Sequence, residues 1–158
     1  YYGVDITDPH TYGTTLYDEL HKRFGGIEYL MIEPGRAMVA NLGCIAAEVL
    51  LVSQKTVGDP VRWIYLDIGR FSGLAETEQE AIKYQISVIG KEDHETSECI
   101  VAGPTCDSAD VMYEHNHRLF PVDLECGDKV IIHNTGAYTM TYSTVAFNGF
   151  PPLRTILI

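Results

Sequence analysis

Val61-Arg62-Trp63-Ile64-Tyr65-Leu66 is the stretch that decides the fold class of this 158-residue chain. Its side chains alternate as in a β-strand, with Arg62, Ile64 and Leu66 on one side and Trp63 and Tyr65 on the other, and the pattern ends at Asp67. Further strand candidates, separated by glycine-bearing or polar turns, are residues 82–89, 98–102, 129–133 and 142–147. Short strands with turns between them predict an all-β sandwich or barrel over residues 37–158. Residues 37–53, rich in small side chains with Val and Leu, fit either a helix or a strand.

Residues 1–36 have a different character. Apolar side chains recur every four residues, at Tyr12, Leu16, Leu20 and Phe24. This spacing predicts one face of a helix, which Gly25-Gly26 would end. Residues 27–32 then predict a short buried strand. A helix, a glycine stop and a strand form an αβ unit, the kind that builds parallel sheets and barrels, so residues 1–36 are expected to be the tail of an α/β domain.

The charge balance and the apolar stretches of the chain indicate which binding partners are disfavoured. The formal net charge is −11, from 22 acidic and 11 basic residues. This balance argues against binding to a nucleic-acid backbone or an anionic membrane surface, because both need clustered Lys and Arg. The longest apolar stretch, residues 42–52, is interrupted by Gly43 and Glu48, and it is shorter than the roughly 18 residues that a membrane-spanning helix needs.

The cysteines indicate free thiols. They stand at positions 44, 99, 106 and 126, without the spacing of a zinc site or the density of a disulfide scaffold. A cytoplasmic protein is therefore expected. His115 and His117 flank Asn116 in what resembles a polar loop, where a solvated turn is favoured over a metal pair, and no metal site is predicted. Since the chain begins Tyr1-Tyr2 without an initiator Met, we expect that a preceding segment was removed or that the chain is part of a larger unit.

Gly103-Pro104-Thr105-Cys106-Asp107-Ser108-Ala109-Asp110 places a thiol and two carboxylates after an apolar run. The Gly-Pro pair predicts a turn, so Cys106 is expected on a held loop. Nearby negative charge disfavours a thiolate, and such a thiol suits proton donation better than nucleophilic attack. A core cysteine at a strand end is the alternative.

Glu33-Pro34-Gly35-Arg36 lies just past the predicted strand at 27–32, where α/β folds hold their ligands. A glycine beside an arginine suits an oxyanion such as phosphate, because the backbone can come close and the guanidinium can bind two oxygens. The carboxylate of Glu33 fits such a site if the ligand also carries a positive group, for example a protonated ring nitrogen. A polar turn is the alternative.

These two motifs are followed in order by Gly136-Ala137-Tyr138-Thr139 and Phe147-Asn148-Gly149-Phe150. The ordered set resembles the C-terminal part of the pyridoxal-phosphate decarboxylases that act on ornithine, lysine or diaminopimelate. Tyr65-Leu66-Asp67-Ile68-Gly69 also resembles a strand end of that family, and the resemblance covers essentially the whole chain. It implies a mainly β chain: residues 1–36 would be the tail of a TIM-like (β/α)8 barrel that binds pyridoxal phosphate, and residues 37–158 the C-terminal β-barrel or sandwich domain.

The resemblance assigns the cofactor's ligands position by position. Glu33 would pair with the pyridinium nitrogen of pyridoxal 5'-phosphate and keep the ring protonated. Gly35 and Arg36 would hold the phosphate, and the Tyr138 hydroxyl would add another hydrogen bond. A buried core tyrosine is the alternative at Tyr138.

The resemblance also assigns the substrate's ligands. Cys106 would return the proton to the α-carbon after carbon dioxide leaves, and Asp107 and Asp67 would bind the distal ammonium; Asp67 could alternatively serve only to end its strand. In the family, Cys106 and Asp107 reach into the neighbouring subunit's site, so the resemblance implies a homodimer with shared active sites.

Asp107 bears on the substrate. Diaminopimelate decarboxylases resemble Gly-Pro-x-Cys-Glu at this motif, so an aspartate favours a substrate that ends in a plain amine. Ornithine is preferred and lysine follows, giving putrescine or cadaverine in polyamine biosynthesis. One methylene changes binding in a pocket by only about 1–3 kcal/mol, and dual activity is compatible with this motif.

The family's Schiff-base lysine has no match in this chain, whose lysines are at positions 22, 55, 83, 91 and 129. We therefore expect the 158 residues alone to be inactive and to need the remaining barrel portion, in the same or a separate polypeptide. The alternative is a catalytically inactive homologue that acts by binding. The presence of both Cys106 and Glu33 favours the enzyme.

Overall fold

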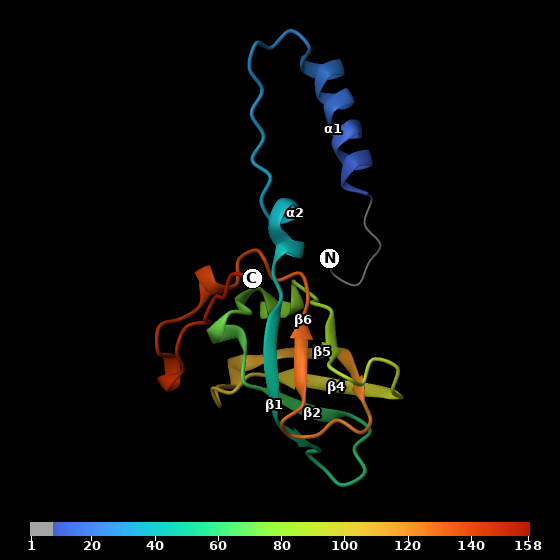
Figure 1. Cartoon of the computed structure of the whole chain (residues 1–158), viewed down its shortest axis with the longest axis vertical. Coiled ribbons are helices and arrows are strands. Elements are labelled where there is room, and N and C mark those ends of the chain that lie inside the picture. Colours follow the sequence, from blue (N-terminus) through green and yellow to red (C-terminus); the bar gives the residue numbers. More distant parts are fainter. Residues whose placement is uncertain (1–7) are drawn as a thin grey trace.

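Six strands form one curled sheet in the computed structural model, which describes residues 8–158 (Figure 1). Their order across the sheet is β3-β6-β1-β2-β4-β5. Only β2 and β4 pair in parallel, and the other neighbours are antiparallel. The strands are β1 (Ile45–Ser53), β2 (Arg62–Leu66), β3 (Ile86–Val88), β4 (Thr96–Ala102), β5 (Val111–Pro121) and β6 (Lys129–Ile132).

The pairing register brings the loops that matter for function to one end of this sheet. Ile45 pairs with Ile132, Tyr65 with Ala102, and Ala102 with Val111. The first residues of β1, β3 and β5 and the last residues of β2, β4 and β6 therefore lie at the same end. The short helix α2 (Arg36–Val39) leads into β1 there, and we call this the α2 end of the sheet (Figure 1).

The curled sheet encloses a hydrophobic core. Burying each large apolar side chain contributes about 1.5–3 kcal/mol relative to leaving it exposed. The largest fully buried side chains include Tyr84, Tyr113, Phe120, Ile64 and Leu66. The Tyr113 hydroxyl donates to the Ile82 carbonyl and accepts from the Tyr84 N–H, both at 3.0 Å. These bonds join β5 to the segment before β3, so side chains link the two outer strands.

Three predicted strands are confirmed: residues 61–66, 98–102 and 129–133 form β2, β4 and β6. The strand predicted at 82–89 is shorter, since β3 covers only Ile86–Val88. The ambiguous run 37–53 contains most of α2, a 3-10 turn (Ala40–Leu42) and β1. The mainly β class is therefore confirmed, as a curled half-barrel sheet.

Two predictions about the C-terminal half were wrong. Residues 142–147 form no strand. Turns replace it, because Ala146 has a left-handed backbone (φ 56°) and the Thr144 N–H donates to the Phe71 carbonyl at 2.8 Å instead of to a strand. His115 and His117 lie in β5 and not in a polar loop. The polar middle of β5 concealed the strand, since it is an outer strand with solvent on one side.

The N-terminal helix is confirmed as α1 (Pro9–Phe24). Its first turn is capped by Asp8, whose carboxylate accepts from the Thr11 N–H at 2.9 Å. The buried strand predicted at 27–32 is wrong: this segment is extended but exposed, and Met31 is 84% exposed. A strand needs a hydrogen-bonded neighbour, and within residues 8–158 no strand pairs with this segment, which runs on its own from α1 to α2 (Figure 1).

Residues 1–7 of the predicted barrel tail lie outside the described residues, and the boundary at residue 36 stays a prediction. None of the helices in the described part of the chain is both long enough and apolar enough to cross a membrane.

Candidate functional site

Gly35, Arg36 and Tyr138 form one group at the α2 end. The Arg36 guanidinium lies over the Tyr138 ring, 5.2 Å from its centre, and forms an ion pair with Glu76. Its side chain is only 15% exposed. A Cβ atom at Gly35 would lie 2.7 Å from the Tyr138 hydroxyl oxygen, so only glycine leaves this space open beside the hydroxyl.

Close backbone packing places Tyr138 against α2. The Gly136 N–H donates to the Ala40 carbonyl at 2.9 Å, and a Cβ atom at Gly136 would lie 1.9 Å from the Val39 carbonyl oxygen. Tyr138 itself has a left-handed backbone (φ 55°), which turns the chain back toward Arg36. Two motifs about 100 positions apart in the sequence are thus brought together.

The loop that carries Cys106 connects β4 to β5 at the same end, and a buried carboxylate holds it. Asp110 is 1% exposed. It accepts hydrogen bonds from the Thr105 hydroxyl at 2.7 Å, the Thr105 N–H at 3.2 Å and the Arg70 N–H at 2.8 Å. Gly69 and Gly103 make room for it, because a Cβ atom at either position would come within 2.3 Å of a carboxylate oxygen.

Cys106 and Asp107 are displayed at the surface of this loop. Both are exposed, and Cys106 has a left-handed backbone (φ 60°). Its thiol points toward the Pro104 carbonyl, 3.9 Å away. The Asp107 carboxylate accepts from the Ala109 N–H at 2.8 Å and starts the 3-10 turn Ser108–Asp110. The loop therefore presents a thiol and a carboxylate from a fixed backbone, and the held loop predicted for Cys106 is confirmed.

The motif around Phe147 supports this loop from outside. The Asn148 side-chain amide donates to the Thr105 carbonyl at 2.9 Å. Phe147 stacks on Phe71, with ring centres 4.1 Å apart and an angle of 23° between the planes. These contacts give Phe147 and Asn148 a supporting role next to the Cys106 loop.

Asp67 and Glu33 stand apart from these two groups. The exposed Asp67 carboxylate accepts from the Glu48 N–H at 2.8 Å, which joins the end of β2 to β1. It also lines a cavity of about 200 Å³ together with residues 150–154. Glu33 is exposed on the extended segment before α2 and forms no ion pair within residues 8–158.

The residues that hold the two groups in place were not predicted from the sequence. Glu76 pairs with Arg36, Asp110 holds the thiol loop, and Arg70 contacts that loop through its backbone and side chain. Only Asp110 left a signal in the sequence, as a second acidic residue in the Cys106 motif.

The four cysteines are free thiols, as predicted. Burial raises the pKa of the Cys99 thiol in β4, so this cysteine stays protonated in the core. No group of three or more His, Cys, Asp or Glu side chains suited to a metal ion occurs in the described part of the chain.

The curled sheet therefore carries an arginine group that suits an anion and a thiol loop at the same end. Residues 5–136 match a family model described as the C-terminal sheet domain of pyridoxal-dependent decarboxylases. The chain belongs to this family. The predicted family and its pyridoxal cofactor are thereby confirmed.

Curated relatives support the same assignment. The chain is 32% identical over 148 residues to a diaminopimelate decarboxylase of Streptomyces coelicolor, covering 89% of this chain and 32% of the relative. It is 33% identical over 156 residues to that of Helicobacter pylori, covering 96% of this chain and 36% of the relative. The chain thus spans about a third of the length of the curated relatives it matches.

Solved structures agree in fold. A lysine/ornithine decarboxylase from Vibrio vulnificus, complexed with cadaverine, superposes with a TM-score of 0.80 at 28% identity. The match covers 99% of this chain and 40% of that one. A diaminopimelate decarboxylase structure gives a TM-score of 0.73 at 28% identity, covering 97% and 38%.

Proposed function

We propose that this chain supplies the C-terminal sheet domain of a pyridoxal-phosphate-dependent decarboxylase that acts on ornithine and lysine. The observation that carries the proposal is the location of two groups at one end of the sheet. One group, Gly35, Arg36 and Tyr138, suits a phosphate, and the other offers the Cys106 thiol and the Asp107 carboxylate on a rigid loop.

The first group fits the phosphate of the cofactor. Because residue 35 is a glycine, a phosphate can come close to the backbone beside the Tyr138 hydroxyl. A guanidinium carries five N–H donors, so the ion pair of Arg36 with Glu76 is compatible with binding phosphate oxygens. Glu33 would accept the N–H of the pyridine ring. When bound, pyridoxal phosphate supplies an electron sink for the carbanion left after loss of carbon dioxide.

The second group would complete the reaction. The Cys106 thiol holds a proton at an exposed sulfur, from which it can be delivered to the substrate's α-carbon. Asp107 and Asp67 would bind the distal ammonium of the substrate. We propose that Cys106 and Asp107 serve the site of a neighbouring subunit, in a homodimer, and that the missing barrel supplies the Schiff-base lysine.

Two substrate classes are in competition. Asp107 favours a substrate with a plain terminal amine, since diaminopimelate decarboxylases resemble Gly-Pro-x-Cys-Glu, with a glutamate at this position. The lysine/ornithine decarboxylase among the structural neighbours supports this choice. Diaminopimelate is the second candidate, because the curated relatives at 32–33% identity are diaminopimelate decarboxylases.

The test uses the complete polypeptide that carries this sequence, supplied with pyridoxal phosphate. Ornithine, lysine and meso-diaminopimelate are offered separately, and the amine products are separated by chromatography. Putrescine or cadaverine from the first two substrates is expected, with turnover of diaminopimelate at least tenfold lower. Preferred turnover of diaminopimelate would overturn the substrate choice, and no turnover of any of the three would overturn the activity. The 158 residues expressed alone serve as a control that should be inactive.

A further inference from the structure

Arg70 contacts the Cys106 loop and the segment that carries Glu76, the ion-pair partner of Arg36. Its backbone N–H donates to the Asp110 carboxylate at 2.8 Å, and its guanidinium donates to the Ala109 carbonyl at 2.6 Å. Both bonds end on the loop that carries Cys106. The same guanidinium also reaches the Thr77 carbonyl at 3.4 Å.

Thr77 belongs to the segment that holds the other group. It lies in the 3-10 segment Ala75–Glu80 and is fully buried, with its hydroxyl donating to the Leu74 carbonyl at 2.7 Å. The residue before it, Glu76, forms the ion pair with Arg36. A path therefore runs from Arg36 through its ion pair to Glu76, along the backbone to Thr77, and through the Arg70 side chain to the loop of Cys106.

We propose that Arg70 is a positioning residue that fixes the Cys106 loop relative to the Arg36 group. Its importance for catalysis rests on the proposed function. If Arg36 holds the cofactor of its own subunit while Cys106 serves the neighbouring subunit, Arg70 links the two active sites of the dimer. A displacement of Arg36 is then transmitted to the thiol of the other site.

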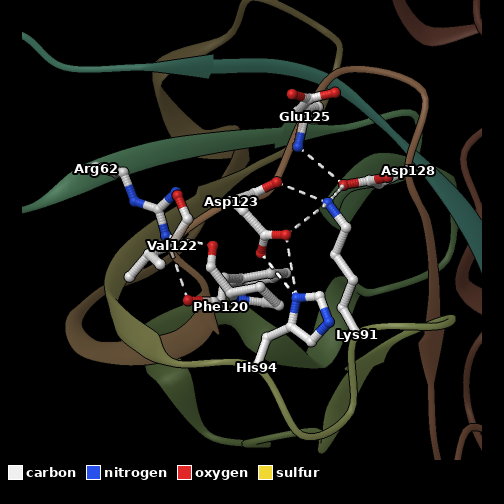
Figure 2. Close-up of polar contacts among 9 residues, drawn as sticks. Arg62, Lys91, His94, Phe120, Val122, Asp123, Glu125 and Asp128 are labelled. Carbon is white, nitrogen blue, oxygen red and sulfur yellow. Dashed lines mark hydrogen bonds and ion pairs between the residues drawn. The ribbon is translucent and has the colours of Figure 1, made fainter.

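Arg62 provides a matched control. At the opposite end of the sheet its guanidinium donates to the carbonyls of Phe120, Pro121 and Val122 at 2.8–3.2 Å (Figure 2). Replacing either arginine by methionine removes guanidinium–carbonyl bonds of the same kind. Only Arg70→Met interrupts the path between the two groups. Comparing the Arg70→Met and Arg62→Met variants therefore separates a positioning role from a general loss of stability.

The experiment is a double-mutant cycle on the complete polypeptide without cofactor or substrate. The alkylation rate of Cys106 by iodoacetamide is measured by mass spectrometry, with exposed Cys44 and Cys126 as internal standards. Glu76→Gln is expected to change the Cys106 rate at least threefold in the wild-type and Arg62→Met backgrounds. In the Arg70→Met background it is expected to change the rate less than 1.5-fold. An equal change in all three backgrounds, or none in the wild type, would overturn the proposal.

Steady-state kinetics give the second readout. Arg70→Met is expected to lower kcat at least tenfold with less than a threefold change in KM, because the loop that delivers the proton loses its side-chain bond to Arg70 while Asp110 still holds its backbone. Arg70→Lys, which retains one donor, should restore part of kcat, and Arg62→Met should leave it unchanged. An inactive wild type would refute the proposed function and leave the alkylation cycle to decide the role of Arg70. An active wild type with an unaffected Arg70→Met would refute the positioning role alone.

Discussion

The Thr105 hydroxyl donates a 2.7 Å hydrogen bond to the Asp110 carboxylate inside the loop that displays Cys106. Both side chains are buried, at 3% and 1% exposure. A buried carboxylate is unfavourable unless hydrogen bonds satisfy it, so the shape of the loop depends on this pair.

Asp110→Asn should therefore destabilise the domain. One oxygen becomes an amide donor facing the donors of Thr105 or Arg70, and loss of such charge-assisted hydrogen bonds costs about 2–3 kcal/mol of the free energy of unfolding. Urea denaturation measures this. Asp93→Asn, at an exposed turn position, is the control and should stay within about 0.5 kcal/mol. Equal losses in the two variants would show that Asp110 does not hold the loop.

Gly136→Ala should disturb the Tyr138 group. The new Cβ would lie 1.9 Å from the Val39 carbonyl oxygen, and the two backbones would have to separate. We expect a loss of about 2–3 kcal/mol in the free energy of unfolding. At Gly13 nothing lies within 4 Å of an added Cβ, so Gly13→Ala should cause no loss. A neutral Gly136→Ala would contradict the close packing of this turn against α2.

The cysteines should differ in reactivity in the native domain. Cys44, Cys106 and Cys126 are exposed, whereas Cys99 is fully buried and its thiol pKa is raised by that burial. Iodoacetamide at pH 8 should label the first three and leave Cys99 unlabelled until urea unfolds the chain. Mass spectrometry of the peptides measures how much each cysteine is labelled. Rapid native labelling of Cys99 would mean that β4 opens readily.

Asp128 should make the domain sensitive to acid. The Lys91 ammonium donates to Asp128 at 2.8 Å (Figure 2) and, with the Glu125 N–H, holds the pKa of this carboxyl below its usual value. Between the two pKa values the unfolded chain binds more protons than the folded one, so stability falls as the pH drops through this range. The stabilisation is complete above about pH 5 and is lost below the usual carboxyl pKa of roughly 3.9. In thermal melts, the melting temperature of Asp128→Asn should fall less than that of the wild type between pH 5 and pH 2.5. An equal fall in both proteins would contradict this.

Cys106→Ala tests the proposed proton donor in the complete polypeptide. Removing the thiol should lower kcat at least a hundredfold with little change in KM, because general acid catalysis contributes about 10²–10⁴ to the rate. Cys126→Ala, which removes another exposed thiol, is the control. Normal turnover to the normal amine by Cys106→Ala would refute the role.

Much of the sheet could be predicted, because its inner strands are short apolar runs bounded by turns. Ile64 and Leu66 in β2 are fully buried, and this strand was placed correctly. β5 could not be recognised, because its polar centre at His115–His117 lies on an outer strand. The segment at 27–32 has the composition of a strand, but composition does not show whether a neighbouring strand is present to pair with it.

For the candidate site, local motifs predicted the displayed residues and not their supports. Cys106 and Arg36 stand in recognisable motifs, and the structure places each in a defined group. Glu76 and Arg70 could not have been predicted, because their roles arise from contacts 39 or 40 positions apart along the chain.

The parallel pairing of β2 with β4 has a consequence for the order of folding. Arg62 pairs with Cys99, and between them the chain must run back through β3 at the far edge of the sheet. Contacts this distant in sequence form slowly, because a long loop must close before any bond is gained. Arg70 lies within that loop, and its partners Ala109 and Asp110 follow β4, so these bonds form only after the chain has returned to the sheet. The hydrogen bonds from Arg70 to the Cys106 loop therefore depend on a strand pairing that closes across all of these residues.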